Sequence, residues 1–148
     1  MAFGAAVAIF AFGGRDTATK AEYRVAVTNA RERVDFALGR LTKAQSLNEL
    51  LDRMDEAAGA TESAANDVDR KNPPAQFEKE HAELTRSLHK LATDVQSTAD
   101  QAREPGFEDI LFGAQGLSFD SWDEVNAALE ALRKKGLRVP LLVRQTTS

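Results

Sequence analysis

The chain has 148 residues, of which 43% are hydrophobic and 28% are charged. This length suits one domain that buries roughly two-thirds of the surface its unfolded chain exposes. Its 19 basic and 23 acidic side chains leave a net charge of −4, which argues against a nucleic-acid partner. Without cysteine, and with only two histidines, the chain lacks the residues for disulfides, thiolate chemistry or a histidine-rich metal centre.

The first 14 residues are apolar and glycine-containing, and the mixed-charge chain begins at Arg15 and Asp16. Thirteen helical residues cover roughly 20 Å, which is less than the roughly 30 Å hydrocarbon core of a bilayer. The length matches the core of a secretory signal, but no basic residue precedes it and no cleavage-site spacing follows Gly14. An uncleaved membrane anchor therefore fits best, and the alternative is a buried segment of the body. The side chains expected to enter the membrane are Phe3, Val7, Ile9, Phe10 and Phe12.

The side of the membrane follows from the flanking charges. Arg15, Lys20 and Arg24 come after the apolar segment and by themselves would hold the body in the cytoplasm. A basic start upstream of Met1 would reverse that orientation. In that second case the helical body is extracytoplasmic, and this is the orientation we expect for a membrane-associated signal-anchor protein.

Residues 20–43 are expected to form the first amphipathic helix. The apolar positions recur at steps of four and three, as on a helix with one buried face. From Arg15 to Ser46 there are seven basic and four acidic side chains, so this is the basic element. Its exposed face is interpreted as solvated, with contact to anionic lipid headgroups beside the anchor as the alternative. The predicted stripe consists of Tyr23, Val27, Ala30, Val34, Ala37, Leu41 and Ala44.

A break near Gln45 precedes the second predicted helix. Ser46 and Glu49 have the spacing of a capping box, which indicates a helix start at Leu47. Two prolines, Pro73 and Pro74, end this helix. The predicted stripe consists of Leu47, Leu51, Met54, Ala58, Thr61, Ala65 and Val68.

The third predicted helix begins near Ala75, ends at residues 104–106 and has the clearest heptad pattern, as in a coiled coil. Between Leu47 and Glu104 there are seven basic and 13 acidic side chains. This negative balance favours packing of the second and third helices beside the basic first helix. The third stripe consists of Phe77, His81, Leu84, Leu88, Leu91, Val95, Thr98 and Ala102.

The carboxy-terminal part follows a Phe-rich connection at residues 107–119. Ser121 and Glu124 again have capping-box spacing, and Gly136 is placed to close the helix that follows. Trp122 is interpreted as a core or staple residue. Residues 139–143 are expected to form an extended strap across the bundle, because Pro140 argues against a central strand.

Together these elements predict an all-α protein: an antiparallel three-helix bundle with an N-terminal apolar anchor helix, a short C-terminal helix and an extended strap. Short connections between long amphipathic helices make neighbours antiparallel. The predicted divisions are the anchor at residues 1–14, the three-helix bundle at 15–104 and the C-terminal loop, helix and tail at 105–148.

Several motifs together resemble secreted or membrane-anchored helical proteins of high-GC Gram-positive bacteria, most of them uncharacterised. The motifs are the apolar start, the Ala- and Arg-rich first helix, the Asn72-Pro73-Pro74 stop, and Phe77-Glu78-x-x-His81-x-x-Leu84. The resemblance covers residues 1–102 and implies a bacterial, membrane-anchored or secreted helical protein. It transfers no active site. The chain departs from the group in having neither a basic leader nor a lipobox cysteine, so lipoprotein anchoring is excluded.

Glu78 and His81 are the only metal-ligand candidates that the spacing offers. An acid and a histidine three residues apart lie on one helix face, as in di-iron helical bundles. Such a centre needs a second pair, but His89 has Arg86 three residues before it. The simpler interpretation is that His81 lies on the apolar stripe and hydrogen bonds to a neighbouring polar group. Ser46 and Ser121 are interpreted as helix caps, so no catalytic residue, cofactor or metal is assigned.

Two classes of function remain. The first is a non-enzymatic, membrane-tethered interaction module that binds a protein or envelope component through a helix face or through residues 107–119. The second is a small-ligand or metal-binding helical protein that uses Glu78 and His81 with carboxylates such as Glu56 or Glu62. The first is preferred, because no motif in the chain has the pattern of a known catalytic site.

Overall fold

The computed structural model describes residues 17–104 and 119–142, and all regular secondary structure in these two ranges is helical. The all-α prediction is therefore confirmed. The elements are α1 (Lys20–Gly39), the 3₁₀ turn η1 (Arg40–Lys43), α2 (Leu47–Asp69), the 3₁₀ turn η2 (Ala75–Phe77), α3 (Glu78–Ala102) and α5 (Asp120–Lys134).

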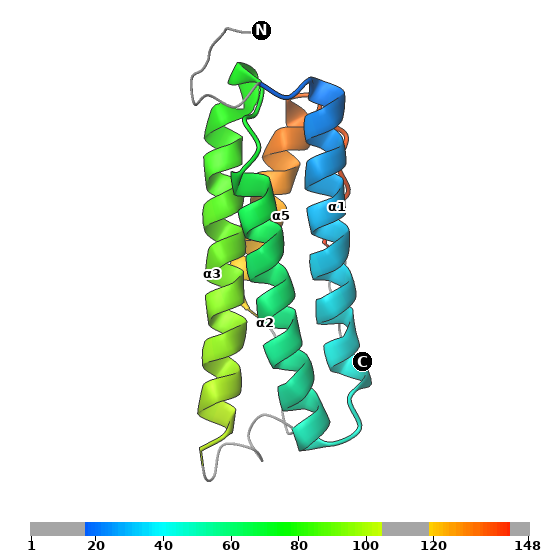
Figure 1. Cartoon of the computed structure of the whole chain (residues 1–148), viewed down its shortest axis with the longest axis vertical. Helices are drawn as coiled ribbons and strands as arrows, with labels where there is room; N and C mark the ends of the chain where they lie inside the picture. Colours follow the sequence, from blue (N-terminus) through cyan, green and yellow to red (C-terminus); the bar gives the residue numbers. More distant parts are fainter. Residues whose placement is uncertain (1–16, 105–118, 143–148) are drawn as a thin grey trace, which may run out of the picture.

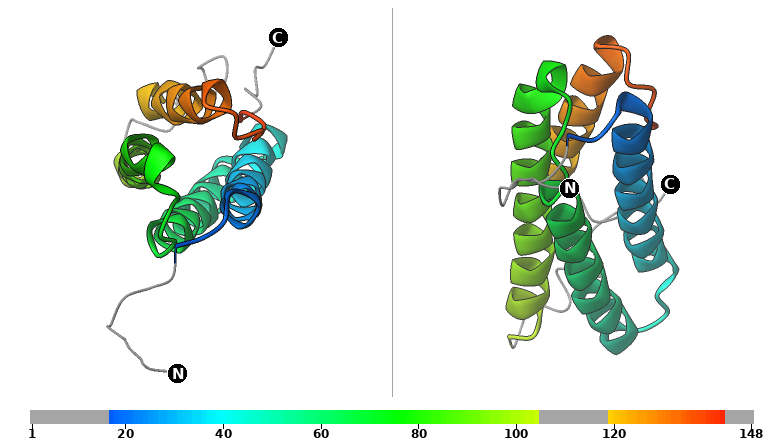
Figure 2. Two further views of the ribbon diagram at one scale, coloured as in Figure 1. Left: turned by 90° about the horizontal axis from the view of Figure 1, so that it is seen from above. Right: turned by 45° about the horizontal axis from the view of Figure 1, so that its top comes forward.

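Four helices pack side by side, and each runs antiparallel to the one before it (Figure 1). Viewed along the bundle, the order is α1, α2, α3 and α5 (Figure 2). The helix at residues 120–134 packs on α3 and completes a four-helix arrangement, where the sequence predicted three helices with a C-terminal unit after them. This helix buries the side chains of Trp122, Val125, Leu129 and Leu132. An apolar face of this kind has to be covered by other helices, which is why the helix joins the bundle instead of forming a separate unit after it.

Side-chain caps begin the first two helices. Thr19 and Glu22 form a reciprocal capping box: the Thr19 hydroxyl accepts from the Glu22 amide at 3.1 Å, and the Glu22 carboxylate accepts from the Thr19 amide at 2.9 Å. The Ser46 hydroxyl accepts from the Glu49 amide at 3.1 Å, as predicted. Glu49 in turn accepts from the amide of Gln45 at 3.0 Å. The break near Gln45 is therefore confirmed.

Ser121 is not a cap, and this prediction was wrong. Helix α5 starts one residue earlier than the motif implied, with Phe119 at the N-cap position and no side-chain capping bond. The hydroxyl of Ser121 instead lies 2.7 Å from a carboxylate oxygen of Asp94 on α3. The pairing became possible because burial of Phe119 and Trp122 turns the first helical residue, Asp120, outward and Ser121 inward.

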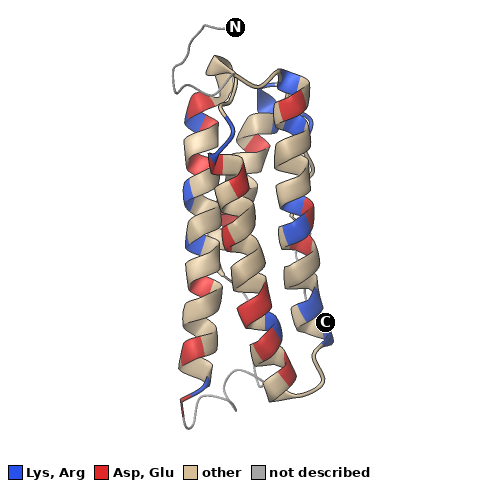
Figure 3. Cartoon of the chain, in the orientation of Figure 1, with Lys and Arg blue, Asp and Glu red and all other residues tan. Residues whose placement is uncertain are grey.

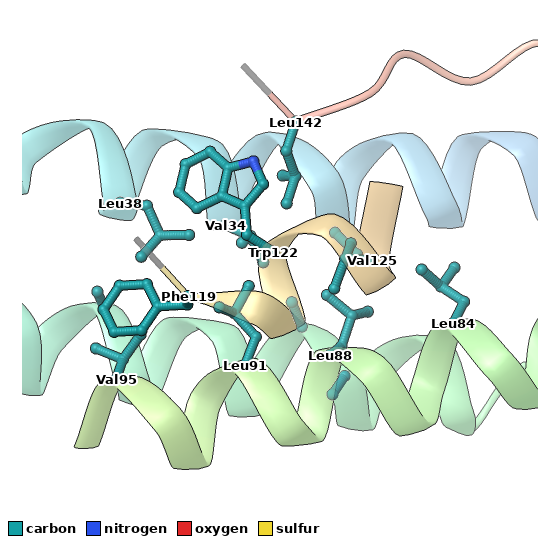
Figure 4. Close-up of a cluster of buried hydrophobic side chains, with 14 of the residues drawn as sticks. Val34, Leu38, Leu84, Leu88, Leu91, Val95, Phe119, Trp122, Val125 and Leu142 are labelled. Carbon is teal, nitrogen blue, oxygen red and sulfur yellow. The ribbon is translucent and has the colours of Figure 1, made fainter. Parts of the chain in front are cut away.

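The core lies between all four helices and contains most of the predicted stripe positions. Leu38 is buried as well, although it lies off the predicted stripe, because α1 faces both α2 and the start of α5. Figure 4 shows Phe119 and Trp122 between Val34 and Leu38 of α1 and Leu91 of α3. Trp122 is therefore a core residue, as expected. The buried stripe residues are Tyr23, Val27, Ala30, Val34, Leu41, Leu51, Met54, Ala58, Thr61, Ala65, Val68, Phe77, Leu84, Leu88, Leu91, Val95 and Ala102.

An extended segment at residues 137–142 covers the seam between α1 and α5. Leu137, Val139 and Leu142 are buried there. The Arg31 side chain on α1 donates to the Leu141 carbonyl at 2.8 Å, and Asn126 on α5 bonds both backbone groups of Leu142. The predicted strap is therefore present among the described residues, and it links two helices that have little direct contact with each other.

The turn that sends the strap back over the bundle depends on Gly136. Its φ of 95° lies in the left-handed region, which favours glycine. The amide of Leu137 donates to the Leu132 carbonyl and the amide of Gly136 to the Arg133 carbonyl, which is the Schellman pattern. Leu132 and Leu137 are both fully buried, so the motif also has its apolar contact.

Candidate functional site

Tyr23 and His81 form a polar contact inside one end of the bundle. The Tyr23 hydroxyl lies 2.8 Å from Nδ1 of His81, and the Tyr23 ring stacks on Phe77 with ring centroids 5.9 Å apart. Burial raises the pKa of the Tyr23 phenol above its ordinary range, and the nearby carboxylate of Glu80 adds to this shift. The phenol is therefore neutral at physiological pH. His81 has the neighbouring polar group that its position on the stripe led us to expect.

Glu80 is the one charged residue that is buried within the described ranges. Its carboxylate accepts a salt bridge from Lys135 at 3.2 Å, and the Lys135 ammonium also donates to the Gln76 carbonyl at 3.0 Å. Burial raises the pKa of Glu80, but its own backbone amide, Lys135 and Lys79 together outweigh burial and leave the pKa below its usual value. This pair attaches the end of α5 to the start of α3. The sequence analysis missed Glu80, which carries no local signal of burial.

The structure does not bring the proposed metal ligands together. Glu78 is exposed, while His81 contacts Tyr23. Glu56 pairs with Arg40 at 3.0 Å, and Glu62 lies 3.0 Å from Nδ1 of His89. Within residues 17–104 and 119–142, no three His, Cys, Asp or Glu side chains are grouped so that they could hold a metal ion. The described geometry favours a packing role for His81.

A groove of about 820 Å³ runs along the outer side of α1 and α2. Its apolar lining includes Val25 and Phe36, whose side chains are 52% and 71% exposed. They are the only large apolar side chains in the described part of the chain that are exposed. Eleven residues separate them, which is three helical turns, so they lie on one face of α1 about 16 Å apart along its axis.

Charged side chains border this groove. Asp67 of α2 pairs with Arg33 of α1 at 2.6 Å and also with Arg70. Glu32 lies in the lining on α1 and forms no ion pair with a described residue. Asp67 thus compensates part of the charge of Arg33 and Arg70, and Lys71 adds a positive charge at one end of the groove. The carboxylate of Glu32 lies between Val25 and Phe36. This arrangement suits a partner that presents apolar and basic groups.

The sequence analysis treated the outer face of α1 as basic and passed over Val25 and Phe36. A signal was available, because two large apolar residues lie off the buried stripe at a spacing that places them on one face. What the sequence could not show is that no helix covers that face. In the described structure, α1 is at the edge of the helix order and packs mainly on α2.

The predicted anchor residues Phe3, Val7, Ile9, Phe10 and Phe12 lie outside the described ranges, as does most of the predicted binding loop at residues 107–119. Among the helices that the structure describes, none combines the length and the apolar character needed to cross a bilayer. Comparisons with protein-family models, curated proteins and solved structures give no match at all. Function is therefore inferred from the residues of this chain.

Proposed function

We propose that this chain is a non-enzymatic, membrane-tethered interaction module that binds a helix of another protein in the groove between α1 and α2. The observation that carries the proposal is the exposure of Val25 and Phe36 on one face of α1. Burying an exposed apolar side chain in a complex lowers the free energy, and Val25 and Phe36 offer a partner two such side chains on one face of the groove.

The chemistry of the groove defines the partner. An amphipathic helix with two apolar side chains three turns apart can contact both Val25 and Phe36. A Lys or Arg between those side chains would face Glu32, whose charge no described residue neutralises. The partner is therefore a basic amphipathic helix.

The tether explains how a surface of this size can be useful. Two exposed apolar side chains and one charge make a small interface, which suits a weak and transient complex. If residues 1–14 attach the module to a membrane, a partner in the same membrane is held at a high effective concentration. The predicted anchor thus supports the proposed interaction without any further contact.

Cell fractionation with protease accessibility tests the attachment. We expect the tagged chain to sediment with membranes, to resist extraction by salt, and to be digested when protease is added outside the cytoplasmic membrane. Recovery in the aqueous fraction would contradict the tether. Digestion only after lysis would contradict the extracytoplasmic location.

Site-specific photocrosslinking tests the groove. A crosslinker at Phe36 is expected to capture one protein, and Val25→Asp should abolish that crosslink. The matched control is a crosslinker at Thr93, which is exposed on α3 and away from the groove. Equal capture from both positions, or capture unaffected by Val25→Asp, would refute the groove as the binding surface. Capture of a second copy of this chain would replace the basic helix by self-association.

A further inference from the structure

One end of the bundle, where α2 turns into α3, collects exposed basic side chains from five segments. Six such residues, named below, form what we call the basic end. In Figure 3 the blue segments gather at the upper ends of α1 and α5, while red segments prevail on the lower half of α2. The basic end consists of Lys20, Arg24, Lys71, Lys79, Lys134 and Arg138.

The basic residues of this end form no ion pairs with carboxylates in residues 17–104 or 119–142, although Glu22, Asp69, Glu78 and Glu80 lie at the same end. Basic residues elsewhere on the bundle are mostly paired, as in Arg40 with Glu56 at 3.0 Å, Arg103 with Asp55 at 2.6 Å and Lys90 with Glu124 at 2.5 Å. Outside this end, Lys43 is an exposed cation that likewise forms no ion pair with a described carboxylate, so most of the basic side chains of the described structure without an ion pair, though not all, lie at one end.

The chain also enters the bundle at this end. The side-chain amide of Asn72, in the turn between α2 and α3, donates to the Thr17 hydroxyl at 3.2 Å. The backbone carbonyl of Asn72 accepts from the amide of Ala18 at 2.8 Å. Residues 1–16 therefore continue from a point that lies among the six basic side chains.

The opposite end has the opposite charge. Acidic side chains outnumber basic ones near the end of α3 and the starts of α2 and α5, where Arg40, Arg53 and Arg103 are ion-paired and Lys43 is exposed. A helix the length of α3 spans about 37 Å, several times the Debye length of about 10 Å at 0.1 M salt. A negatively charged surface would attract one end of the bundle and not the other. Among these acidic residues are Glu49, Asp52, Asp100, Glu104 and Asp120.

We infer that the basic end lies against anionic phospholipid headgroups and orients the long axis of the bundle away from the bilayer. The inference builds on the proposed tether at residues 1–14, because that tether brings this end to the membrane. Each Lys or Arg close to an anionic bilayer increases affinity about fivefold. Lys71 also lines one end of the groove, and in this orientation the groove extends away from the bilayer along α1 from Val25 to Phe36.

Vesicle partitioning of the full-length protein tests the inference. The vesicles contain phosphatidylcholine alone or with phosphatidylglycerol, at about 0.1 M salt. The test variant Arg24→Gln/Lys71→Gln/Lys134→Gln removes three charges of the basic end. The control variant Lys43→Gln/Lys90→Gln/Arg103→Gln removes three exposed charges, one midway along α3 and two at the opposite end. Urea denaturation of each variant verifies that it folds.

We expect the parent protein to prefer vesicles with phosphatidylglycerol, and the test variant to lose roughly 100-fold in partitioning onto them. The control variant should change by about threefold or less, because its charges are screened at their distance from the surface. Equal losses in both variants, or no preference for anionic vesicles, would overturn the inference.

The two vesicle types separate this inference from the tether. Binding to phosphatidylcholine alone reports insertion of the apolar segment. If that binding is absent while the basic-end variant still loses its affinity for phosphatidylglycerol vesicles, the tether fails and the lipid-facing end stands. Tight binding to both vesicle types with no effect of the variant supports the tether and refutes the basic end as a lipid surface.

Discussion

The hydroxyl of Tyr23 and Nδ1 of His81 lie 2.8 Å apart, although 58 positions separate the two residues in the chain. Tyr23 is fully buried, and its ring packs against Phe77 on the turn before α3. The contact joins α1 to α3 at the end of the bundle where the chain enters. It gives both a buried phenol and a partly buried imidazole a partner, so it stabilises this end of the fold.

Replacement of the phenol measures this contact. Tyr23→Phe keeps the ring packing but removes the hydroxyl that contacts Nδ1 of His81, so we expect a loss of about 1–2 kcal/mol in the free energy of unfolding. Urea denaturation at neutral pH measures the change. In a double-mutant cycle with His81→Ala, the double variant should lose less free energy of unfolding than the sum of the losses of the two single variants. Full additivity would show that the pair contributes nothing to stability.

The ionisation of Tyr23 offers a spectroscopic prediction, because it is the only tyrosine in the chain. Its pKa is raised by burial and by Glu80, so the native protein should show no tyrosinate absorbance near pH 10, whereas the unfolded chain should titrate there. The folded state holds this proton more tightly. The resulting stability is fully present below pH about 10 and is lost as the pH rises above the pKa of the unfolded chain. Native titration that coincides with the unfolded curve would contradict the burial of Tyr23.

The buried carboxylate of Glu80 makes stability depend on Lys135. Because the folded pKa of Glu80 is lowered, its ionisation stabilises the fold above the unfolded value of 4.5 and this contribution is lost as the pH falls. Lys135→Met removes the salt-bridge partner, so the pKa of Glu80 should rise toward the value that burial favours, against the backbone amide and Lys79. We expect about 1–3 kcal/mol of destabilisation at neutral pH and a smaller loss at acidic pH, where the carboxyl group is neutral.

Denaturation of the Lys135→Met variant at several pH values measures this effect. Glu80→Gln is the matched control, because it removes the charge and should abolish the dependence on Lys135. A loss that is equal at neutral and acidic pH would show that Lys135 acts only through packing of its side chain.

Ser46 and Ser121 share a sequence motif but have different roles, and this can be measured. Ser46→Ala removes an N-cap and should cost about 1 kcal/mol. Ser121→Ala removes a hydrogen bond to a carboxylate and should cost about 1.5–3 kcal/mol. Only the effect of Ser121→Ala should depend on Asp94, so its combination with Asp94→Ala should be non-additive, whereas Ser46→Ala with Asp94→Ala should be additive. The reverse pattern would restore Ser121 as a cap.

Phe36 and Phe77 provide a matched pair that separates a surface role from a core role. Phe36 is 71% exposed and Phe77 is fully buried. Phe77→Ala should destabilise the fold by about 3–5 kcal/mol, while Phe36→Ala should change stability by less than about 0.5 kcal/mol. Denaturation curves measure both. A large loss for Phe36→Ala would indicate that its side chain stabilises this fold and would weaken the case for an interaction surface.

Much of the fold was predictable from local signals. The stripe from Tyr23 to Leu41, the cap at Ser46, the stop at the two prolines and the turn at Gly136 each depend on residues within a few positions of one another. Short-range geometry decides these features, so the sequence pattern was enough. The motif at Ser121 failed because the burial of Phe119 and Trp122 against the other helices decided where α5 begins, and no local pattern reports that burial.

The candidate site was less predictable. Glu78 and His81 have a spacing that suggests chemistry, yet His81 contacts Tyr23, which no local pattern connects to it. Val25 and Phe36 were visible as apolar residues off the stripe, but their exposure depends on which faces of α1 the other helices leave open. The salt bridge between the buried Glu80 and the exposed Lys135 joins residues 55 positions apart, so sequence separation concealed it.

The sequence by itself determined that the described chain is helical, where three of its helices lie and which faces are apolar, because periodicity and capping act over one or two turns. Only the tertiary structure decided that residues 120–134 complete a four-helix arrangement and that α1 keeps an open apolar face. It also decided that basic side chains from five segments meet at one end of the bundle. Those features depend on contacts between residues far apart in the chain, and these contacts exist only once the apolar faces have packed together.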